Sequence, residues 1–200
     1  MSKPVTNVII AGLGGQGVLT ASDILADAVL AAGLDVKKSE LHGMSQRGGS
    51  VTSDVRFGER VLSPMVPPGE ADYLVVLAAD QVEVNRHLLR PEGVLISPGR
   101  IDENALPNRR SFNVAMLGAL SRHLQIEQSN WLAAIKANLP DSLYQANVQA
   151  FEIGRAAADG SPRSLPPAQP PGGYEGVDAD DWSLERLVRR VQPHKRRMGP

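Results

Sequence analysis

Cysteine is absent from this chain of 200 residues. Its absence excludes disulfide bonds, thiolate catalysis, cysteine-ligated zinc and any iron–sulfur cluster held by cysteines of this chain. It also agrees with a reducing compartment. Aromatic residues make up only 4% of the chain, too few for a stacking surface that binds single-stranded nucleic acid. The formal net charge of -1 gives no overall attraction to nucleic acid or to anionic lipid, so we expect neither as a partner.

Long apolar runs are absent as well. No stretch approaches the roughly 18 consecutive apolar residues that a membrane-spanning helix needs. The polar segment 1–7 has none of the features of a secretory signal. We therefore expect a soluble, cytoplasmic protein without membrane contact. A content of 42% hydrophobic and 22% charged residues is ordinary for a globular chain, and the length fits one domain or one domain with a tail.

The first half of the chain predicts alternating strands and helices. Expected strands cover residues 7–11, 35–41, 51–57 (with 60–62 as a possible hairpin partner), 73–78 and 94–97, and expected helices cover 18–32 and 80–89. The second half predicts helices at 114–124, 129–139 and 141–158. This order is typical of the α/β class. We expect a three-layer, mostly parallel Rossmann-like sheet with a helical second half and an extended C-terminal arm.

The composition changes after residue 158. Segment 161–173 contains five prolines and offers little to bury, which is typical of an extended linker or arm. Residues 182–191 could form a short helix that docks on this chain or on a partner. We therefore divide the chain into a module at 1–158 and a proline-rich, partner-docking arm at 159–200.

A glycine-rich motif follows the first expected strand. Gly12, Gly14 and Gly17 satisfy the pattern G-x-G-x-x-G, in which glycines allow a tight turn and a close approach of the backbone to a phosphate at a helix N-terminus. Gly15 and Gln16 add flexibility and an amide to the same turn. Glu40 lies roughly where an acidic residue binds a ribose, which indicates an NAD(P) or FAD site. The alternative is that the glycines only permit a close strand–helix crossing.

A second polar, glycine-rich segment, residues 42–50, follows the next expected strand, at the carboxyl edge of the sheet where ligands of α/β proteins bind. Its candidate ligand-binding residues are Gln46, Arg47, Gly48 and Gly49. Arg47 could bind a phosphate or a carboxylate in a bidentate manner, and His42 could act as an acid or base. Alternatively, the segment is an ordered interface loop in which Arg47 pairs with an acid across a subunit boundary. Both roles can hold together.

Other catalytic motifs are missing. The four histidines show no metal-ligand spacing, so we expect no metal site. The chain has no G-x-S-x-G hydrolase elbow, and segment 12–17 lacks the G-K-[ST] ending of a P-loop.

Segments 8–20 and 39–51 together resemble the gamma-type module of the 2-oxoacid (pyruvate/ketoisovalerate):ferredoxin oxidoreductases, and the second segment is most similar to the beta subunit of indolepyruvate ferredoxin oxidoreductases. The two motifs agree in order and spacing, and the resemblance runs from about residue 5 to residue 158. Further matching positions are Ser63-Pro64, Glu70-Ala71-Asp72, Asn113, Leu117-Gly118-Ala119, Asn147, Ala150-Phe151 and Gly154.

The resemblance implies a subunit of a thiamine-dependent enzyme that converts indolepyruvate or another arylpyruvate to its acyl-CoA. It places thiamine diphosphate and iron–sulfur clusters on a larger companion subunit, coenzyme A as co-substrate, and ferredoxin or another acceptor as the destination of the electrons. Carried over to this chain, the loops Gly12–Gly17 and His42–Gly49 face the shared site, with His42 and Arg47 as catalytic candidates. The lack of cysteine agrees with this division, because a chain doing the whole reaction needs cluster ligands. A free-standing dinucleotide-binding oxidoreductase and a purely structural subunit remain alternatives.

Overall fold

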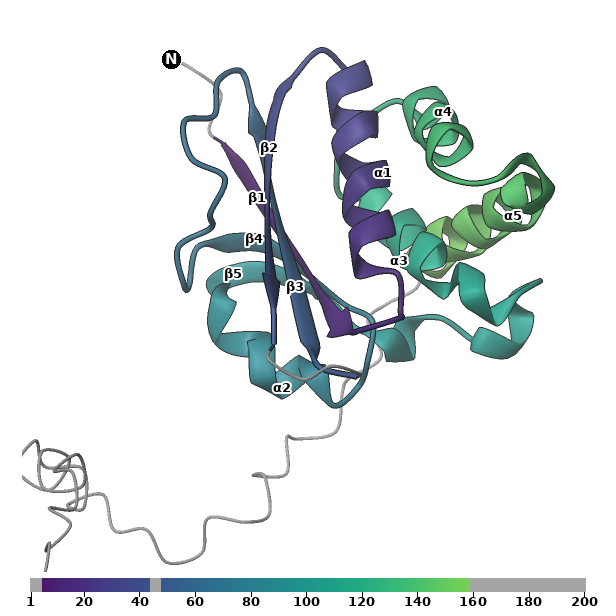
Figure 1. Cartoon of the computed structure of the whole chain (residues 1–200), viewed down its shortest axis with the longest axis horizontal. Helices are drawn as coiled ribbons and strands as arrows, with labels where there is room; N and C mark the ends of the chain where they lie inside the picture. Colours follow the sequence, from purple (N-terminus) through teal and green to yellow (C-terminus); the bar gives the residue numbers. More distant parts are fainter. Residues whose placement is uncertain (1–4, 44–47, 159–200) are drawn as a thin grey trace, which may run out of the picture. The chain divides into compact units, whose positions relative to one another are not determined.

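Five strands form a single sheet in the part of the chain that the computed structural model describes, residues 5–43 and 48–158 (Figure 1). The expected arm at 159–200 lies outside the described residues. The strands are β1 (Thr6–Leu13), β2 (Asp35–His42), β3 (Ser50–Gly58), β4 (Ala71–Val76) and β5 (Leu89–Ile96). The α-helices are α1 (Val18–Ala31), α2 (Gln81–Asn85), α3 (Phe112–Ser121), α4 (Gln128–Asn138) and α5 (Asp141–Ala158). Short 3-10 helices cover Arg86–Leu88, Pro98–Arg100, Glu103–Ala105 and Arg109–Ser111.

The strand order is β2-β3-β1-β4-β5, and the pairing is mixed. β1 pairs in parallel with β4, and β4 with β5, whereas β3 is antiparallel to both β1 and β2. The α/β class is confirmed, but the expected mostly parallel sheet is wrong in one respect: β3 lies between β1 and β2. The connection at 43–49 is too short for the crossover of a dozen or more residues that a parallel pair needs, so β2 and β3 form a hairpin.

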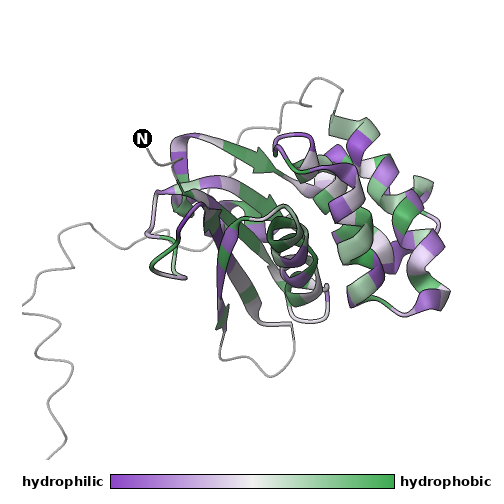
Figure 2. Ribbon diagram, turned by 90° about the horizontal axis from the view of Figure 1, so that it is seen from above, coloured by the Kyte–Doolittle hydropathy of each residue, from purple (hydrophilic) through white to green (hydrophobic). Residues whose placement is uncertain are grey.

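The two faces of the sheet are covered unequally. Val8 and Ile10 of β1 face a large core shared with α1, α3, α4 and α5. Ile9 and Ala11 point to the other face, where the smaller core contains Val82 of α2. Figure 1 shows the four longer helices together on one side of the sheet. Burial on both faces explains why β1 is an uninterrupted apolar run, and the three layers are present with a thin second helical layer. Figure 2 shows the molecule from above, with hydrophobic (green) and hydrophilic (purple) segments along the helices beside the sheet.

Residues 60–62, the expected hairpin partner of β3, are not a strand. The backbone N–H of Val61 donates to Asp35 Oδ2 at 2.7 Å. Arg56 Nη1 donates to the carbonyl oxygens of Ser63 at 3.1 Å and Met65 at 3.0 Å. Side chains of β2 and β3 therefore satisfy the backbone of this segment in place of a strand ladder.

The expected helix at 80–89 is shorter than its apolar spacing indicates. α2 ends at Asn85, a 3-10 turn covers Arg86–Leu88, and β5 already begins at Leu89. Pro91 lies within β5 and is compatible with it because β5 is an edge strand, where a missing N–H costs no ladder bond. None of the described helices is both long and apolar enough to cross a membrane.

Helices α3 and α5 cross in close contact. A Cβ atom placed on Gly118 would lie 2.1 Å from the carbonyl oxygen of Phe151, and one on Gly154 would lie 1.8 Å from that of Ala115. Each helix therefore meets the backbone of the other through a glycine. This contact holds α3 against the second half of α5.

Candidate functional site

The glycine-rich turn between β1 and α1 is held by its own backbone and by Gln16. The N–H of Gln16 donates to the carbonyl oxygen of Leu13 at 3.1 Å, and the N–H of Leu13 donates to Gln16 Oε1 at 2.8 Å. Gly17, the residue that precedes α1, has φ 79° and provides no side-chain cap. Gln16 thus stabilises the turn, while the first N–H groups of α1 have no acceptor within the helix.

The glycines of this turn have different roles. Gly12 is buried, and a Cβ there would lie 2.9 Å from Gln16 Oε1 and 3.1 Å from Leu77 Cβ, so its role is close packing. Gly14 and Gly15 are exposed, and Gly15 has φ 93° with no atom within 4 Å of the point where a Cβ would lie. α1 carries no acidic residue in its first turn. The exposed side of the turn therefore combines open backbone with the positive end of a helix dipole, which favours an anion.

The second glycine-rich segment lies against the first. The N–H of Gly14 donates to the carbonyl oxygen of Gly49 at 2.9 Å, and the N–H of Gly43 donates to that of Ser50 at 2.8 Å. A Cβ on Gly14 would lie 3.7 Å from the backbone nitrogen of Gly48. The structure thus brings together Gly12–Gly17 and Gly48–Gly49 at the carboxyl edge of the sheet. Gln46 and Arg47 lie outside the described residues.

His42 ends β2 at the same edge, with its side chain 54% exposed and Nε2 3.8 Å from Glu40 Oε2. Glu40 also pairs with Lys38 Nζ at 3.0 Å, and Lys38 in turn pairs with Asp23 of α1. Glu40 is therefore already engaged, and β3 separates its strand from β1. A ribose-binding acid of a dinucleotide site stands on a strand next to the glycine-rich one, so this geometry does not favour the dinucleotide hypothesis.

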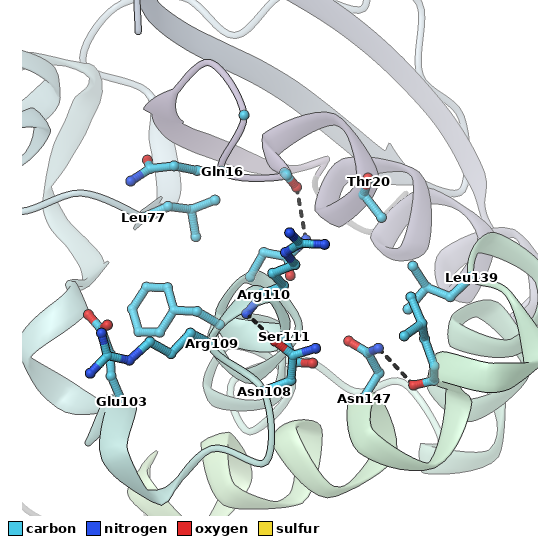
Figure 3. Close-up of a pocket in the computed structure, with 15 residues that line it drawn as sticks. Gln16, Thr20, Leu77, Glu103, Asn108, Arg109, Arg110, Ser111, Leu139 and Asn147 are labelled. Carbon is cyan, nitrogen blue, oxygen red and sulfur yellow. Dashed lines mark hydrogen bonds between the residues drawn. The ribbon is translucent and has the colours of Figure 1, made fainter.

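A cavity of about 530 Å³ opens on the helical side of the glycine turn (Figure 3). Gly15, Gln16, Gly17 and Thr20 form one wall. The facing wall consists of residues before and within α3 and α5: Asn108, Arg109, Arg110, Ser111, Asn113 and Asn147. One acidic residue, Glu103, and four apolar residues complete the lining: Leu77, Phe112, Leu139 and Leu143.

Asn113 connects these two walls. Its Nδ2 donates to the carbonyl oxygen of Gly17 at 3.1 Å, and its Oδ1 accepts the N–H of Val114 at 2.9 Å. A Cβ on Gly17 would lie 2.5 Å from Asn113 Nδ2, so the glycine is required both by its φ and by this contact. The start of α3 is thereby fixed beside the start of α1.

The wall at 108–111 was not predicted from the sequence. The apolar spacing predicts a helix only from residue 114, whereas α3 begins at Phe112, and the adjacent arginines carry no motif. One local signal was available: an asparagine before a helix is a common cap, and Asn108 Oδ1 does accept the N–H of Arg110 at 2.9 Å. No group of three or more potential metal-ligating side chains occurs among the described residues.

The chain matches the model of the pyruvate ferredoxin/flavodoxin oxidoreductase family over residues 7–107. A relative named indolepyruvate oxidoreductase subunit IorB, from Pyrococcus horikoshii, is 47% identical over 194 residues, with 76% of this chain and 95% of the relative covered. The protein of the same name from Thermococcus kodakarensis is 33% identical, with the same coverage.

Solved structures show the same fold. The gamma subunit of a keto/oxoacid ferredoxin oxidoreductase from Geobacter sulfurreducens aligns with a TM-score of 0.60 at 22% identity, over 76% of this chain and 98% of that chain. The 2-oxoglutarate:ferredoxin oxidoreductase from Magnetococcus marinus, solved with 2-oxoglutarate, coenzyme A and succinyl-CoA bound, aligns with a TM-score of 0.70 at 20% identity, over 82% of this chain. This chain spans about a third of that longer chain, 32%. The chain therefore belongs to the pyruvate ferredoxin/flavodoxin oxidoreductase family, as a subunit of a ferredoxin-dependent 2-oxoacid oxidoreductase.

Proposed function

We propose that this chain is the cluster-free subunit of a cytoplasmic indolepyruvate:ferredoxin oxidoreductase, and that its two glycine-rich loops form the coenzyme A end of the shared active site. The reaction cleaves the bond between the carbonyl carbon and the carboxylate of an arylpyruvate, releases carbon dioxide and joins the acyl group to the thiol of coenzyme A. An electron pair leaves for ferredoxin or another acceptor. The names of the two relatives include indolepyruvate, which supports an aromatic substrate for this chain.

The observation that carries this proposal is the contact between the two loops. The backbones of Gly14 and Gly49 are joined by a hydrogen bond of 2.9 Å. The turn between β1 and α1 and the connection between β2 and β3 therefore meet at one edge of the sheet. Parallel strands β1 and β4 end there, and ligands of open α/β sheets bind at such an edge. The exposed backbone at Gly14 and Gly15 suits the phosphates of coenzyme A, which the Magnetococcus enzyme binds.

The remaining cofactors are assigned to a larger companion subunit. Thiamine diphosphate would supply the carbonyl chemistry there, and iron–sulfur clusters would carry the electrons. This chain has no cysteine to hold a cluster. We assign to this chain the binding and orientation of coenzyme A, with Gln46, Arg47, Gly48 and Gly49 as ligand-binding residues beside Gly12, Gly14, Gly15, Gln16 and Gly17. His42 is the candidate acid or base, and residues 159–200 are the arm that docks on the companion.

Reconstitution with the companion subunit tests this function. We expect indolepyruvate- and coenzyme A-dependent reduction of ferredoxin only when both subunits are present. Turnover of a 2-oxoacid by this chain alone, with a dye as acceptor, would show that the subunit assignment is wrong.

A purely structural role is separated from an active-site role by Arg47→Ala in the assembled complex. Loss of turnover with assembly and cluster content unchanged supports an active-site role. Unchanged turnover supports a role confined to the interface.

A further inference from the structure

We infer that the cavity between the glycine turn and the start of α3 binds a nucleoside phosphate, with the phosphates at Arg109 and Arg110 and the nucleoside toward Ser111 and Asn147. The inference rests on the proposed function in one respect, because both use the turn at Gly15–Gly17. It adds a second set of residues, and it names the ligand class that these residues select.

Two arginines and one acidic residue, Glu103, line this cavity, so the charged side chains carry an excess of one positive charge. Arg109 and Arg110 are adjacent and exposed, and neither guanidinium forms a hydrogen bond or ion pair with any residue that the structure describes. Arg109 extends toward Glu103, whereas Arg110 lies in the middle of the view, between the glycine turn and Asn147 (Figure 3). The N-terminus of α1, which has 14 residues and no acidic residue in its first turn, faces the same space. Guanidinium groups and helix N-termini together favour phosphate.

Two largely buried polar residues, Ser111 and Asn147, line the interior of the cavity. Ser111 is 2% exposed, and its hydroxyl has no hydrogen-bond partner among the described residues, although it lines the cavity. Asn147 is 5% exposed and uses Nδ2 to donate to the carbonyl oxygen of Leu143 at 2.8 Å, which leaves Oδ1 as an acceptor. Neither Ser111 Oγ nor Asn147 Oδ1 is among the fully buried side-chain atoms without a partner, so both are open to the cavity, where a ligand can supply their hydrogen bonds.

The size and lining of the cavity favour more than an inorganic ion. A volume of about 530 Å³ lies within the range of sites for organic ligands. Phe112, Leu139 and Leu143 offer apolar contacts beside the two uncharged polar groups. A nucleoside phosphate matches this division into a charged mouth and a mixed, neutral interior, whereas an arylpyruvate would place one carboxylate against two guanidinium groups.

Titration of the full-length chain with ADP, pyrophosphate and adenosine tests the inference. We expect ADP to bind more tightly than pyrophosphate, and adenosine to bind weakly. Arg110→Ala should weaken binding of ADP and pyrophosphate about tenfold or more, because a charge-assisted contact is lost. Ser111→Ala should weaken ADP binding and leave pyrophosphate binding unchanged.

Arg60→Ala is the matched control. Arg60 is also exposed, and it follows β3 at the opposite edge of the sheet from the glycine turn. The inference is overturned if ADP does not bind at millimolar concentration, if adenosine binds as well as ADP, if Arg60→Ala weakens binding as much as Arg110→Ala, or if indolepyruvate displaces ADP. Melting temperatures of the variants exclude unfolding as the cause. The titration uses the free chain, whereas the proposed function is tested by turnover of the reconstituted complex. The two proposals can therefore fail separately.

Discussion

Asn113 Nδ2 and the carbonyl oxygen of Gly17 form a hydrogen bond of 3.1 Å between residues 96 positions apart. The bond joins the start of α3 to the turn before α1, and Asn113 is only 6% exposed. A single amide thus holds together the two walls of the cavity.

Substitution of Asn113 by alanine should destabilise the chain by about 1–3 kcal/mol, because it leaves the carbonyl oxygen of Gly17 and the N–H of Val114 without their partners. Chemical denaturation measures this change. Asn104→Ala is the control, since Asn104 is exposed and only its backbone N–H takes part in a hydrogen bond. Equal effects of the two substitutions would show that the bond contributes nothing.

The crossing of α3 and α5 predicts a larger effect. Gly118→Ala and Gly154→Ala place a methyl group within 2.1 Å and 1.8 Å of a carbonyl oxygen, so the helices must separate. We expect each to destabilise the chain by about 3 kcal/mol or to prevent folding, at or beyond the usual range for overpacking. Gly99→Ala, with no atom within 4 Å of the new methyl group, should change stability by less than about 0.5 kcal/mol. A variant at Gly118 as stable as the one at Gly99 would contradict the close contact.

Local sequence signals were sufficient to predict the elements whose residues follow a strand or helix pattern over a short stretch. The apolar run of β1, the glycine turn and the spacing of α1 predicted the opening of the fold, and α5 begins and ends as expected. The position of β3 was not predictable in this way, because pairing with β1 and β2 depends on the hairpin at 43–49. An alternating strand fits any neighbour of suitable polarity.

Part of the candidate site was likewise predictable from local sequence, and part was not. The two glycine-rich loops are recognisable by composition, and their contact through Gly14 and Gly49 follows from the shared sheet edge. The wall at Asn108–Ser111 has only the capping asparagine as a local signal, and this does not predict that the wall faces the glycine turn. That placement depends on Asn113 and on the α3–α5 crossing. Its residues are distant in sequence from the motif that they complete.

His123 predicts a pH dependence of stability. Burial, with a contribution from the charge of Arg100, lowers the pKa of His123 below its ordinary value of 6.5. The unfolded chain therefore binds a proton at this residue at a higher pH than the folded chain. Stability should fall as the pH drops below 6.5 and toward the lowered pKa, and His123→Gln should remove this part of the slope. An NMR titration of the imidazole checks the sign, and a midpoint at or above 6.5 would contradict it.

The arrangement of Glu40 predicts that the chain does not bind nicotinamide or flavin dinucleotides tightly. Glu40 pairs with Lys38 Nζ at 3.0 Å, and β3 separates its strand from the glycine turn. Titration with NADH, NADPH and FAD should show no micromolar binding. If such binding occurred and Glu40→Ala abolished it, the dinucleotide hypothesis would replace the proposed one.

Gly15 and Gly33 provide a matched pair for testing the role of the glycine turn in the reconstituted complex. Both have positive φ, 93° and 80°, and neither has an atom within 4 Å of an added methyl group. Alanine at either position should therefore cost about 1–2 kcal/mol of stability through the same backbone strain. Only Gly15 lines the cavity, whereas Gly33 follows α1 at its other end.

Gly15→Ala should raise the KM for coenzyme A roughly tenfold, the effect of losing one close contact between backbone and phosphate, with a smaller change in kcat. Gly33→Ala should leave the KM unchanged, because its strain acts on stability alone. Steady-state kinetics at saturating indolepyruvate, together with melting temperatures, separate the two effects. If both variants raised the KM equally, general destabilisation would account for it, and the glycine turn would have no direct contact with coenzyme A.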